Sequence, residues 1–353
     1  MSKFVSFPSI RQYKDAIKQI QQSAKFHEVS IPTLRFYGTV KLHGTNAGIV
    51  CDSAGKWHTQ SRERAIVPGD DNAGFAGAVY GSAEAWNKVF ENLGVSKLSE
   101  KQQLCVFGEW CGGNIQKGVG ISKLPKMFVV FGVGVATQEQ TEGGEEHFNI
   151  AWWELTPELR ELFTAELRNF QFHFSTDFET FFVDVDCEVP ALQQNEFAKL
   201  TLAVEEECPV AKQLLPDSEE ILIGEGIVWE VDLGGSTYDP LLRNTLRTLR
   251  FKTKGEKHSA SKVKVVAQVD ETKVKGIEEF VEFACTQNRL QQGLDKLAEK
   301  GLEPVSENTG EFIRWVIGDI AKEEAGTLEA SGLTLKEVSN RIASKARSFY
   351  SNL

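Results

Sequence analysis

Long apolar runs are missing from this chain of 353 residues. No stretch approaches the roughly eighteen consecutive apolar residues that a membrane helix needs. The opening residues, "MSKFVSFPSI", also lack the charged-then-apolar layout of a secretory signal. We therefore expect a protein with no membrane partner and a cytoplasmic location.

Cysteine spacings typical of metal sites or disulfide frameworks are missing as well. No C-x-x-C pattern and no metal-ligand spacing of cysteine with histidine occurs. This argues against a structural zinc site and a disulfide scaffold, so we expect reduced thiols. The six cysteines are Cys51, Cys105, Cys111, Cys187, Cys208 and Cys285.

Low-complexity segments and internal repeats are also absent, which excludes a fibrous or solenoid protein. The composition, 41% hydrophobic and 25% charged, is that of an ordered globular chain. Its length favours two compact units with enough interior for a catalytic cleft.

The net charge of -11 disfavours a nonspecific nucleic-acid coat protein, because binding to phosphates requires local cations. The charge is unevenly spread, however. Residues 243–264, "RNTLRTLRFKTKGEKHSASKVK", hold eight lysines and arginines against one acidic residue, Glu256. This basic run is either a solvated helix or linker face, or a surface for a polyanion.

The chain up to about residue 260 is typical of an α+β domain. Short segments rich in aromatic and β-branched residues, punctuated by Gly, Asn and Asp, predict mostly antiparallel strands. Helical spacing of apolar residues predicts helices near 9–25, 74–93, 157–168 and 191–206. The expected strands are "RFYGTVKL", "NAGIVCD", "KWHTQSR", "LCVFGEW", "MFVVFGVGV", "TFFVDV", "ILIGEGIVWEVD" and "LRFKTK".

Beyond about residue 265 the pattern is helical only. Asn308 with Glu311, and Thr334 with Glu337, have the spacing of capping boxes at helix starts. We therefore expect a strand-rich domain over residues 1–262 and a small all-helical domain over 263–353. The basic run lies at their joint, where a cleft for an extended ligand is expected.

The stretch "VKLHGTNAGIVC" places a lysine, Lys41, at a strand end before a glycine-containing turn. Such a lysine can serve as a nucleophile once its amine is neutral, although only roughly one free lysine in a thousand is neutral near pH 7.4. Neighbouring cations and partial burial would lower its pKa. The alternative is a plain turn, with Gly44 and Asn46 present for positive φ and Lys41 a surface charge.

The six residues "KLHGTN" resemble the K-x-H-G-T-N nucleotidyl-transfer motif of ATP-dependent RNA ligases. This form is found in the phage double-strand nick-sealing enzymes, the RNA ligase 2 family, and in the kinetoplastid RNA-editing ligases. DNA ligases and capping enzymes typically show K-x-D-G. The resemblance implies an antiparallel-sheet nucleotidyltransferase domain, ATP-grasp-like, over residues 1–262, followed by a helical RNA-binding domain.

Three later segments resemble further motifs of the family, in the family's order. Arg62 in "HTQSRERAI" resembles the arginine that contacts the phosphate of the RNA, and Glu109 in "VFGEW" resembles the glutamate on the nucleotide ribose. Phe131 in "MFVVFGV" resembles the aromatic that stacks on adenine. Taken alone, these could be an edge-strand arginine, a strand-end glutamate and a core phenylalanine.

Two segments complete the set. Glu225 in "GEGIVWE" matches E-G-x-V, whose carboxylate suits a metal ion or its water shell, although a lone Glu-Gly would indicate only a turn. Lys252 and Lys254 in "LRFKTKG" match K-x-K. Alternate residues of a strand face one side, so both ammonium groups are expected in one pocket.

One position departs from the family pattern. The residue after the stacking aromatic is commonly acidic in the family, whereas this chain has Gly132.

The resemblance further implies that His43 lies near the departing pyrophosphate. We assign Asn46 to the RNA end, as a turn residue, because a 2′-hydroxyl there would distinguish RNA from DNA.

The resemblance implies ATP and Mg²⁺ as cofactors, with Mn²⁺ as a substitute, and RNA as the partner. Lys41 would form a lysine-AMP, its pKa lowered by the metal, Lys252 and Lys254; AMP would pass to an RNA 5′-phosphate, and a 3′-OH would then seal the break. No obligate protein partner is evident, and a phage origin would place the enzyme in the host cytoplasm. The alternatives are a DNA ligase, a capping guanylyltransferase, or a noncatalytic RNA-binding module with a retained nucleotide pocket.

Overall fold

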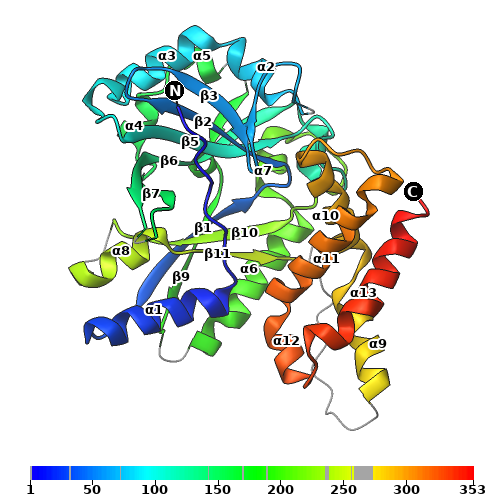
Figure 1. Ribbon diagram of the computed structural model, residues 1–353. Coiled ribbons are helices and arrows are strands. Elements are labelled where there is room, and N and C mark those ends of the chain that lie inside the picture. Colours follow the sequence, from blue (N-terminus) through cyan, green and yellow to red (C-terminus); the bar gives the residue numbers. More distant parts are fainter. Residues whose placement is uncertain are drawn as a thin grey trace. The chain divides into compact units, whose positions relative to one another are not determined.

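The computed structural model divides into two compact units, residues 1–255 and 256–353 (Figure 1). It describes residues 2–31, 33–71, 73–141, 143–168, 171–187, 190–234, 238–255, 257 and 273–353. The predicted boundary between residues 262 and 263 lies outside the described residues. The expected order of an α+β unit followed by helices is confirmed.

Two antiparallel sheets form the first unit. One has the strand order β11-β10-β1-β9, and the other the order β4-β3-β2-β5-β6-β7, with β8 pairing in parallel with β6. The strands are β1 (Leu34–Lys41), β2 (Thr45–Asp52), β3 (Trp57–Ser61), β4 (Ala65–Ile66), β5 (Gln102–Cys111), β6 (Met127–Gln140), β7 (Glu146–Trp153), β8 (Phe172–Phe174), β9 (Thr180–Val185), β10 (Gly226–Val231) and β11 (Arg250–Lys254).

The smaller sheet has one apolar face. Phe36 of β1, Trp229 of β10 and Phe251 of β11 are fully buried in one core cluster with residues of α1 (Tyr13–His27) and α6 (Gln194–Glu206). Successive strand residues point to opposite faces, so Lys41, Lys252 and Lys254 lie on or near the other face. The packing of the apolar face thus fixes where the cations can be.

The larger sheet carries the second core of the unit, and one irregularity. Phe107 of β5 pairs with Gly132 of β6, but the next residue, Gly108, pairs with Val130. Phe131 is therefore the extra residue of a β-bulge, a feature that bends a strand and re-aims its side chains.

Helices cover the two sheets and connect their strands. Thr156 caps α4 through its side chain, with Pro157 in the first turn, at the start of the helix predicted from residue 157. The basic run contributes most of a helix, α8, and then β11, and beyond Gly255 it lies outside the described residues apart from Lys257. The helices not yet given are α2 (Phe75–Tyr80), α3 (Ala83–Asn92), α4 (Pro157–Glu161), α5 (Ala165–Arg168), α7 (Pro209–Leu214) and α8 (Pro240–Thr248).

An extended N-terminal segment, residues 2–11, links the two sheets. Val5 exchanges hydrogen bonds with the side chain of Gln60 on β3, at 3.2 and 2.6 Å. Phe7 is buried against Phe107 and Phe131, with ring centroids 5.2 and 5.1 Å apart. Arg11 then pairs with β11, accepting a 3.1 Å hydrogen bond from the amide of Lys252.

All six cysteines are free and buried. Burial raises the pKa of each thiol, to about 12 for Cys51 and about 11 for Cys285. The thiols behave as small apolar groups of the core, and the expectation of reduced cysteines agrees with this arrangement.

The second unit is helical throughout its described part. Thr334 and Glu337 form the predicted capping box, whereas the one predicted at Asn308 is wrong, because Glu311 there pairs with Lys300 and Arg314 instead. Its helices are α9 (Lys273–Ala284), α10 (Gln287–Glu299), α11 (Thr309–Glu323), α12 (Ala325–Ala330) and α13 (Leu335–Tyr350).

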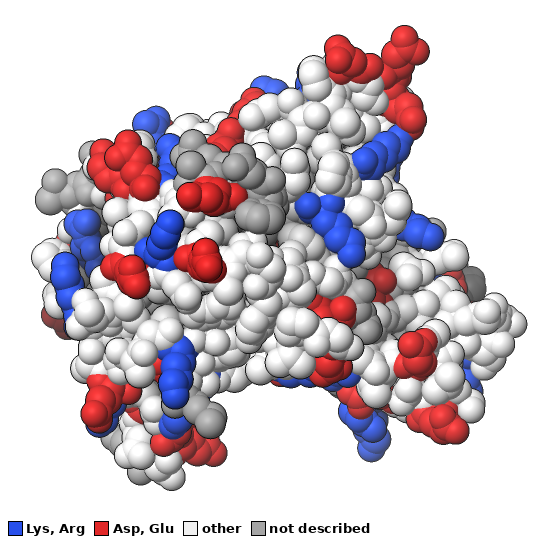
Figure 2. Space-filling model, turned by 90° about the horizontal axis from the view of Figure 1, so that it is seen from above, with Lys and Arg blue, Asp and Glu red and all other residues white. Residues whose placement is uncertain are grey.

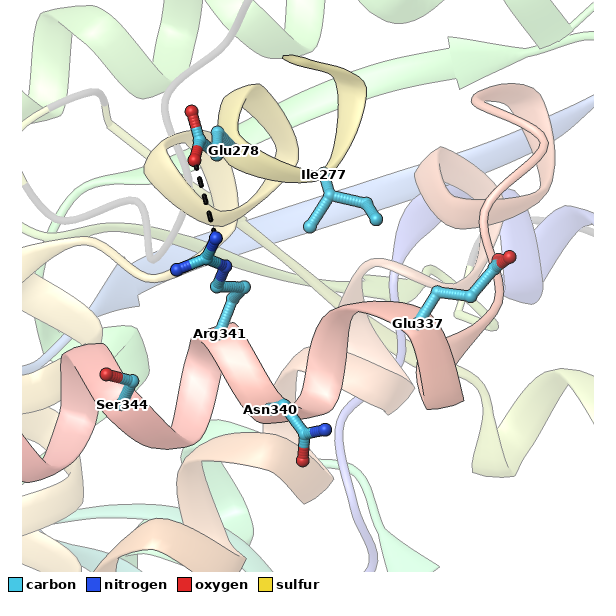
Figure 3. Close-up of a pocket in the computed structure, with 6 residues that line it drawn as sticks. All are labelled: Ile277, Glu278, Glu337, Asn340, Arg341 and Ser344. Carbon is cyan, nitrogen blue, oxygen red and sulfur yellow. Dashed lines mark ion pairs between the residues drawn. The ribbon is translucent and has the colours of Figure 1, made fainter. Parts of the chain in front are cut away.

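A shallow hollow of about 420 Å³ opens between α9 and α13 of this unit (Figure 3). Glu278 and Arg341 face each other across it at 3.8 Å, and both side chains are largely exposed. An ion pair in this position is screened by water and contributes little to stability.

The surface mixes charges of both signs. On the face shown in Figure 2, acidic and basic side chains alternate over wide uncharged areas. No helix in the described part of the chain is both long enough and apolar enough to span a bilayer.

Candidate active site

Lys41 is the last residue of β1 and lies beside Gly226 of β10, which in turn pairs with Lys254 of β11. The register therefore brings Lys41 and Lys254, 213 positions apart in sequence numbering, to either side of one glycine. The side chains of both lysines are about one-fifth exposed, at 19% and 20%. Both side chains are thus largely shielded from solvent.

Glu225 joins these lysines to His43. Its Oε2 accepts a 2.7 Å hydrogen bond from Lys41 Nζ and lies 3.2 Å from His43 Nδ1, while its Oε1 lies 3.0 Å from Lys254 Nζ. The carboxylate is 2% exposed. Burial alone would raise the pKa of Glu225, but Lys41, Lys254 and His43 outweigh burial and hold that pKa well below its usual range.

Gly226, directly after Glu225, could not be another residue without strain. Its φ is +151°, and a Cβ there would lie 2.1 Å from the carbonyl oxygen of Thr253. The close approach of β10 and β11 at this point thus depends on the E-G pair. Close packing of the two strands therefore explains why the E-G-x-V pattern has a glycine at this position.

Lys41 does not have the lowered pKa expected from the sequence. Burial lowers the pKa of Lys41, and so does the Arg62 guanidinium, but Glu225 and then Glu109 outweigh both and raise it. Without ligands, a carboxylate rather than a cation is the nearest charge. The expectation of a lowered pKa through Lys252 and Lys254 is therefore wrong for this state.

The turn after Lys41 is held by Glu109 of β5. The backbone N–H of Gly44 donates a 3.0 Å hydrogen bond to Glu109 Oε1. A Cβ on Gly44 would lie 2.4 Å from the carbonyl oxygen of Trp110. Gly44 is required by this close approach and not by a positive φ, which corrects the alternative reading of the turn.

Asn46 lies in β2, opposite Glu109, in agreement with the expected strand "NAGIVCD", so its assignment to the turn is wrong. Its side-chain oxygen is buried and has no hydrogen-bond partner among the described residues. A buried acceptor without a hydrogen bond lowers the stability of the folded state by about 1–3 kcal/mol. A ligand that donates a hydrogen bond to Asn46 would recover that cost.

The other predicted site residues lie on the same strands or beside them. Lys252 precedes Lys254 by two residues on β11, opposite Val228, so the K-x-K pair shares a face as predicted. Arg62 follows β3 and is close enough to influence the charge of Lys41. Phe131 is half-buried, and its ring meets that of Phe7 edge-on at 5.1 Å.

The sequence reading missed two residues next to this site. Arg250 of β11 pairs with Glu230 at 2.9 Å, and its guanidinium lies 4.5 Å from the ring centre of Trp152 of β7. Arg250 continues the alternation of Lys252 and Lys254, which is the signal that could have indicated it. Trp152 could not be found in this way, since its strand was not predicted.

The family model described as RNA ligase matches residues 34–289 of this chain. No curated protein matches this chain. Among solved structures, an RNA ligase of Naegleria gruberi with PPi is similar at 18% identity and a TM-score of 0.40, over 72% of this chain and 57% of that one.

Two point mutants of the same Naegleria gruberi ligase are similar as well. The one with AMP and Mn has 16% identity and a TM-score of 0.40, and the one with ATP and Mn has 17% and 0.39. Each match covers 72% of this chain and 57% of the other. This chain thus corresponds to a little over half of those proteins.

Proposed function

This chain belongs to the RNA ligase family, and from that premise we propose that it is an ATP-dependent RNA ligase that forms a covalent lysyl-AMP on Lys41. The observation that carries the proposal is the convergence of Lys41, His43 and Lys254 on the buried carboxylate of Glu225. One amine with a nucleophile's position and a second cation beside it are what transfer of a nucleotide to lysine needs.

In the first step, Lys41 Nζ attacks the α-phosphorus of ATP. The ammonium first releases a proton to solvent, the phosphorus–nitrogen bond forms with loss of a second proton to solvent, the bond from the α-phosphorus to the bridging oxygen breaks, and pyrophosphate leaves with the electron pair. Lys252 and Lys254 neutralise the charge on the α-phosphate, and His43 lies near the leaving group. Catalysis of such a displacement is mostly positioning and charge neutralisation.

The donor set fits a hard divalent cation, Mg²⁺ or Mn²⁺, carried by the nucleotide. Among the described residues, no three His, Cys, Asp or Glu side chains are grouped to enclose a metal. Mg²⁺ usually keeps its waters and takes one or two carboxylates together with substrate phosphates, so the deprotonated Glu225 suffices. When bound, the cation supplies charge neutralisation on the phosphates.

The nucleoside is bound from the larger sheet. Glu109, which already accepts a hydrogen bond from Gly44, is placed to bind the ribose. Phe131 provides the aromatic face for adenine, on the bulge of β6. Phe107, two residues before Glu109 on β5, and Phe131 both contact Phe7, which supports one common face for ribose and base.

In the later steps AMP passes from Lys41 to an RNA 5′-phosphate, and a 3′-OH attacks the activated phosphorus and releases AMP. Arg62 binds the phosphate of the RNA end. Asn46, with its buried oxygen unpartnered, accepts a hydrogen bond from the strand end, and a ribose 2′-OH is a donor that DNA lacks. The proposed substrates are nicks in duplex RNA, or RNA ends with a 5′-phosphate and a 3′-OH.

The helical unit supports RNA joining over the related reactions. DNA ligases and capping guanylyltransferases typically carry a β-barrel after the K-x-K strand. Here the described residues after β11 form α9 to α13 and no strand. We propose residues 263–353 as the RNA-binding domain and 1–262 as the adenylyltransferase domain.

Intact mass measurement after incubation with ATP and Mg²⁺ tests the proposal. The wild-type chain should gain the mass of one AMP, Lys41→Ala should gain none, and Lys199→Ala, which removes a largely exposed lysine, should behave as the wild type. A wild-type chain without the adduct, or an adduct that persists in Lys41→Ala, would contradict the nucleophile. Sealing of nicked RNA against nicked DNA then tests the substrate.

A further inference from the structure

Arg250 connects the two sheets of the first unit. It is the first residue of β11, is 8% exposed, and donates from Nε to Glu230 Oε1 of β10 at 2.9 Å. Its guanidinium lies over the ring of Trp152, 4.5 Å from the ring centre. A guanidinium over an indole face is a favourable contact that strengthens when it is shielded from water.

The place of the Trp152 ring depends on a glycine. A Cβ at Gly132 would lie 2.7 Å from Cζ3 of Trp152, closer than carbon atoms can pack. Gly132 follows the bulge residue Phe131 and is the position where the resemblance leads one to expect a carboxylate. In this chain the indole occupies the space in which that side chain would lie.

The same ring is fixed from a second side. Phe7 of the N-terminal segment meets Trp152 edge-on at 5.5 Å and Phe131 at 5.1 Å. The pairing of β1, β10 and β11 places Tyr37, Glu230 and Arg250 in one row across the smaller sheet. The Glu230 carboxylate in this row holds the Arg250 guanidinium. Burial and the Glu230 carboxylate raise the pKa of Tyr37, so its hydroxyl stays protonated.

We propose that the Trp152–Arg250 pair is a positioning element of the nucleotide site. It holds β11, with Lys252 and Lys254, at a fixed distance from β6, with Phe131. The inference rests on the proposed function, because it assigns these two strands to the α-phosphate and to the base of one ATP. Neither Trp152 nor Arg250 needs to touch the nucleotide.

The geometry explains why a small shift would matter. Lys254 reaches Glu225 at 3.0 Å, and Arg250 lies four residues before it on the same five-residue strand. A strand of that length transmits a displacement at one end to the other. Because transfer of the α-phosphoryl group depends on alignment, a shift of about 1 Å can slow the reaction about a hundredfold.

The test compares Trp152→Leu with Trp153→Leu in the full chain. Both residues are half-buried neighbours on β7, but Trp153 packs against the other face of the sheet, away from Arg250. The readouts are the ATP dependence of lysyl-AMP formation from α-labelled ATP and the melting temperature of each variant.

Trp152→Leu should slow lysyl-AMP formation at saturating ATP, by up to about a hundredfold, and should raise the half-saturating ATP concentration about tenfold, the size expected for loss of a shielded cation–π contact. Trp152→Phe, which keeps an aromatic face, should recover most of this loss. Trp153→Leu should lower the melting temperature without changing the ATP dependence. The same ATP dependence in Trp152→Leu and Trp153→Leu would overturn the inference.

Gly132→Ala provides a second test that leaves both partners in place. Its methyl group should displace the indole and reproduce the Trp152→Leu effect, and the double variant Gly132→Ala, Trp152→Leu should be no worse than Trp152→Leu alone. Additive losses would contradict a shared contact. A wild-type chain without label would overturn the proposed function together with this inference, whereas a labelled wild type with unaltered variants would overturn this inference alone.

Discussion

Glu225 controls the charge of Lys41 at the scale of single residues. The 2.7 Å contact between them keeps the amine as an ammonium in the unliganded chain. An ammonium cannot attack phosphorus. In the proposed reaction, the neutral amine would become available when Glu225 takes another cation as its partner, which would couple the nucleophile to the arrival of the charged nucleotide complex.

The pH dependence of lysyl-AMP formation should show this coupling. Since the pKa of Lys41 is raised, the neutral fraction at a given pH is smaller than for a free lysine, and the rate should increase with pH through the alkaline range. More Mg²⁺ should move the increase to lower pH, because the cation competes for Glu225. Rates measured from pH 6 to about 10 at two Mg²⁺ concentrations test this. A pH profile of the rate that is the same at both Mg²⁺ concentrations would refute the coupling.

Arg62 should matter more for joining than for the first step. It follows β3 and lies near Lys41, on the side of the larger sheet. We expect Arg62→Ala to slow sealing of nicked RNA at least about tenfold, consistent with the loss of a charged phosphate contact, and to affect lysyl-AMP formation less. Arg64→Ala is the control, because Arg64 pairs with Asp70 instead. Equal loss of both activities in Arg62→Ala would speak against its role at the RNA end.

The sequence motifs indicated candidate site residues, but the structural reasons for some of these residue types could not be predicted. The K-x-H-G-T-N and K-x-K patterns indicated Lys41, Lys252 and Lys254 directly. Gly44 could not be explained, because its reason is the carbonyl of Trp110, which lies 66 positions further along the chain. Asn46 was expected both as a turn residue and as the first residue of the strand "NAGIVCD", because the sequence alone does not separate a turn from the start of the strand that follows it.

At the scale of elements, most strands were predicted, including the edge strands β9 and β11, but β4, β7 and β8 were not. β7, "EHFNIAWW", was missed because it lies at the edge of its sheet and exposes most of its first half. α8 was not distinguished within the basic run, where charge obscured its buried Leu242 and Leu246. Neither omission affected the site motifs, but the missing β7 concealed Trp152.

The N-terminal segment should be a major source of stability for the first unit. Phe7 is 4% exposed and contacts rings of both β5 and β6. Phe7→Ala should lower the free energy of unfolding by about 3–5 kcal/mol. Phe26→Ala, at a position 82% exposed, should change it by no more than about 0.5 kcal/mol. Denaturant unfolding measures both, and similar values for the two variants would show that the segment is dispensable.

At the scale of the whole molecule, the residues that converge on Lys41 all belong to the first unit. A chain ending at residue 255 should therefore still form lysyl-AMP, while joining of RNA should fall at least about a hundredfold with the loss of most of the phosphate-binding energy. Intact mass and nick sealing measure the two activities. Loss of lysyl-AMP in a folded truncated chain would place part of the first step in the helical unit.

The fold class followed from the sequence, because strand-like segments end near residue 255 and only helical periodicity follows. The pairing of the sheets did not. Periodicity shows which face of a strand is apolar, but the contact of Arg250 with Trp152 depends on two strands about a hundred residues apart. Such contacts are set by tertiary packing, which a single sequence does not reveal.

The six buried thiols make this chain a convenient scaffold for spectroscopic labels. None of them is accessible in the folded state, and their raised pKa values keep them unreactive. A cysteine introduced at an exposed position would therefore react selectively with a maleimide dye. One dye on each unit would allow distances between the units to be followed by energy transfer during a turnover, with the native cysteines left in place.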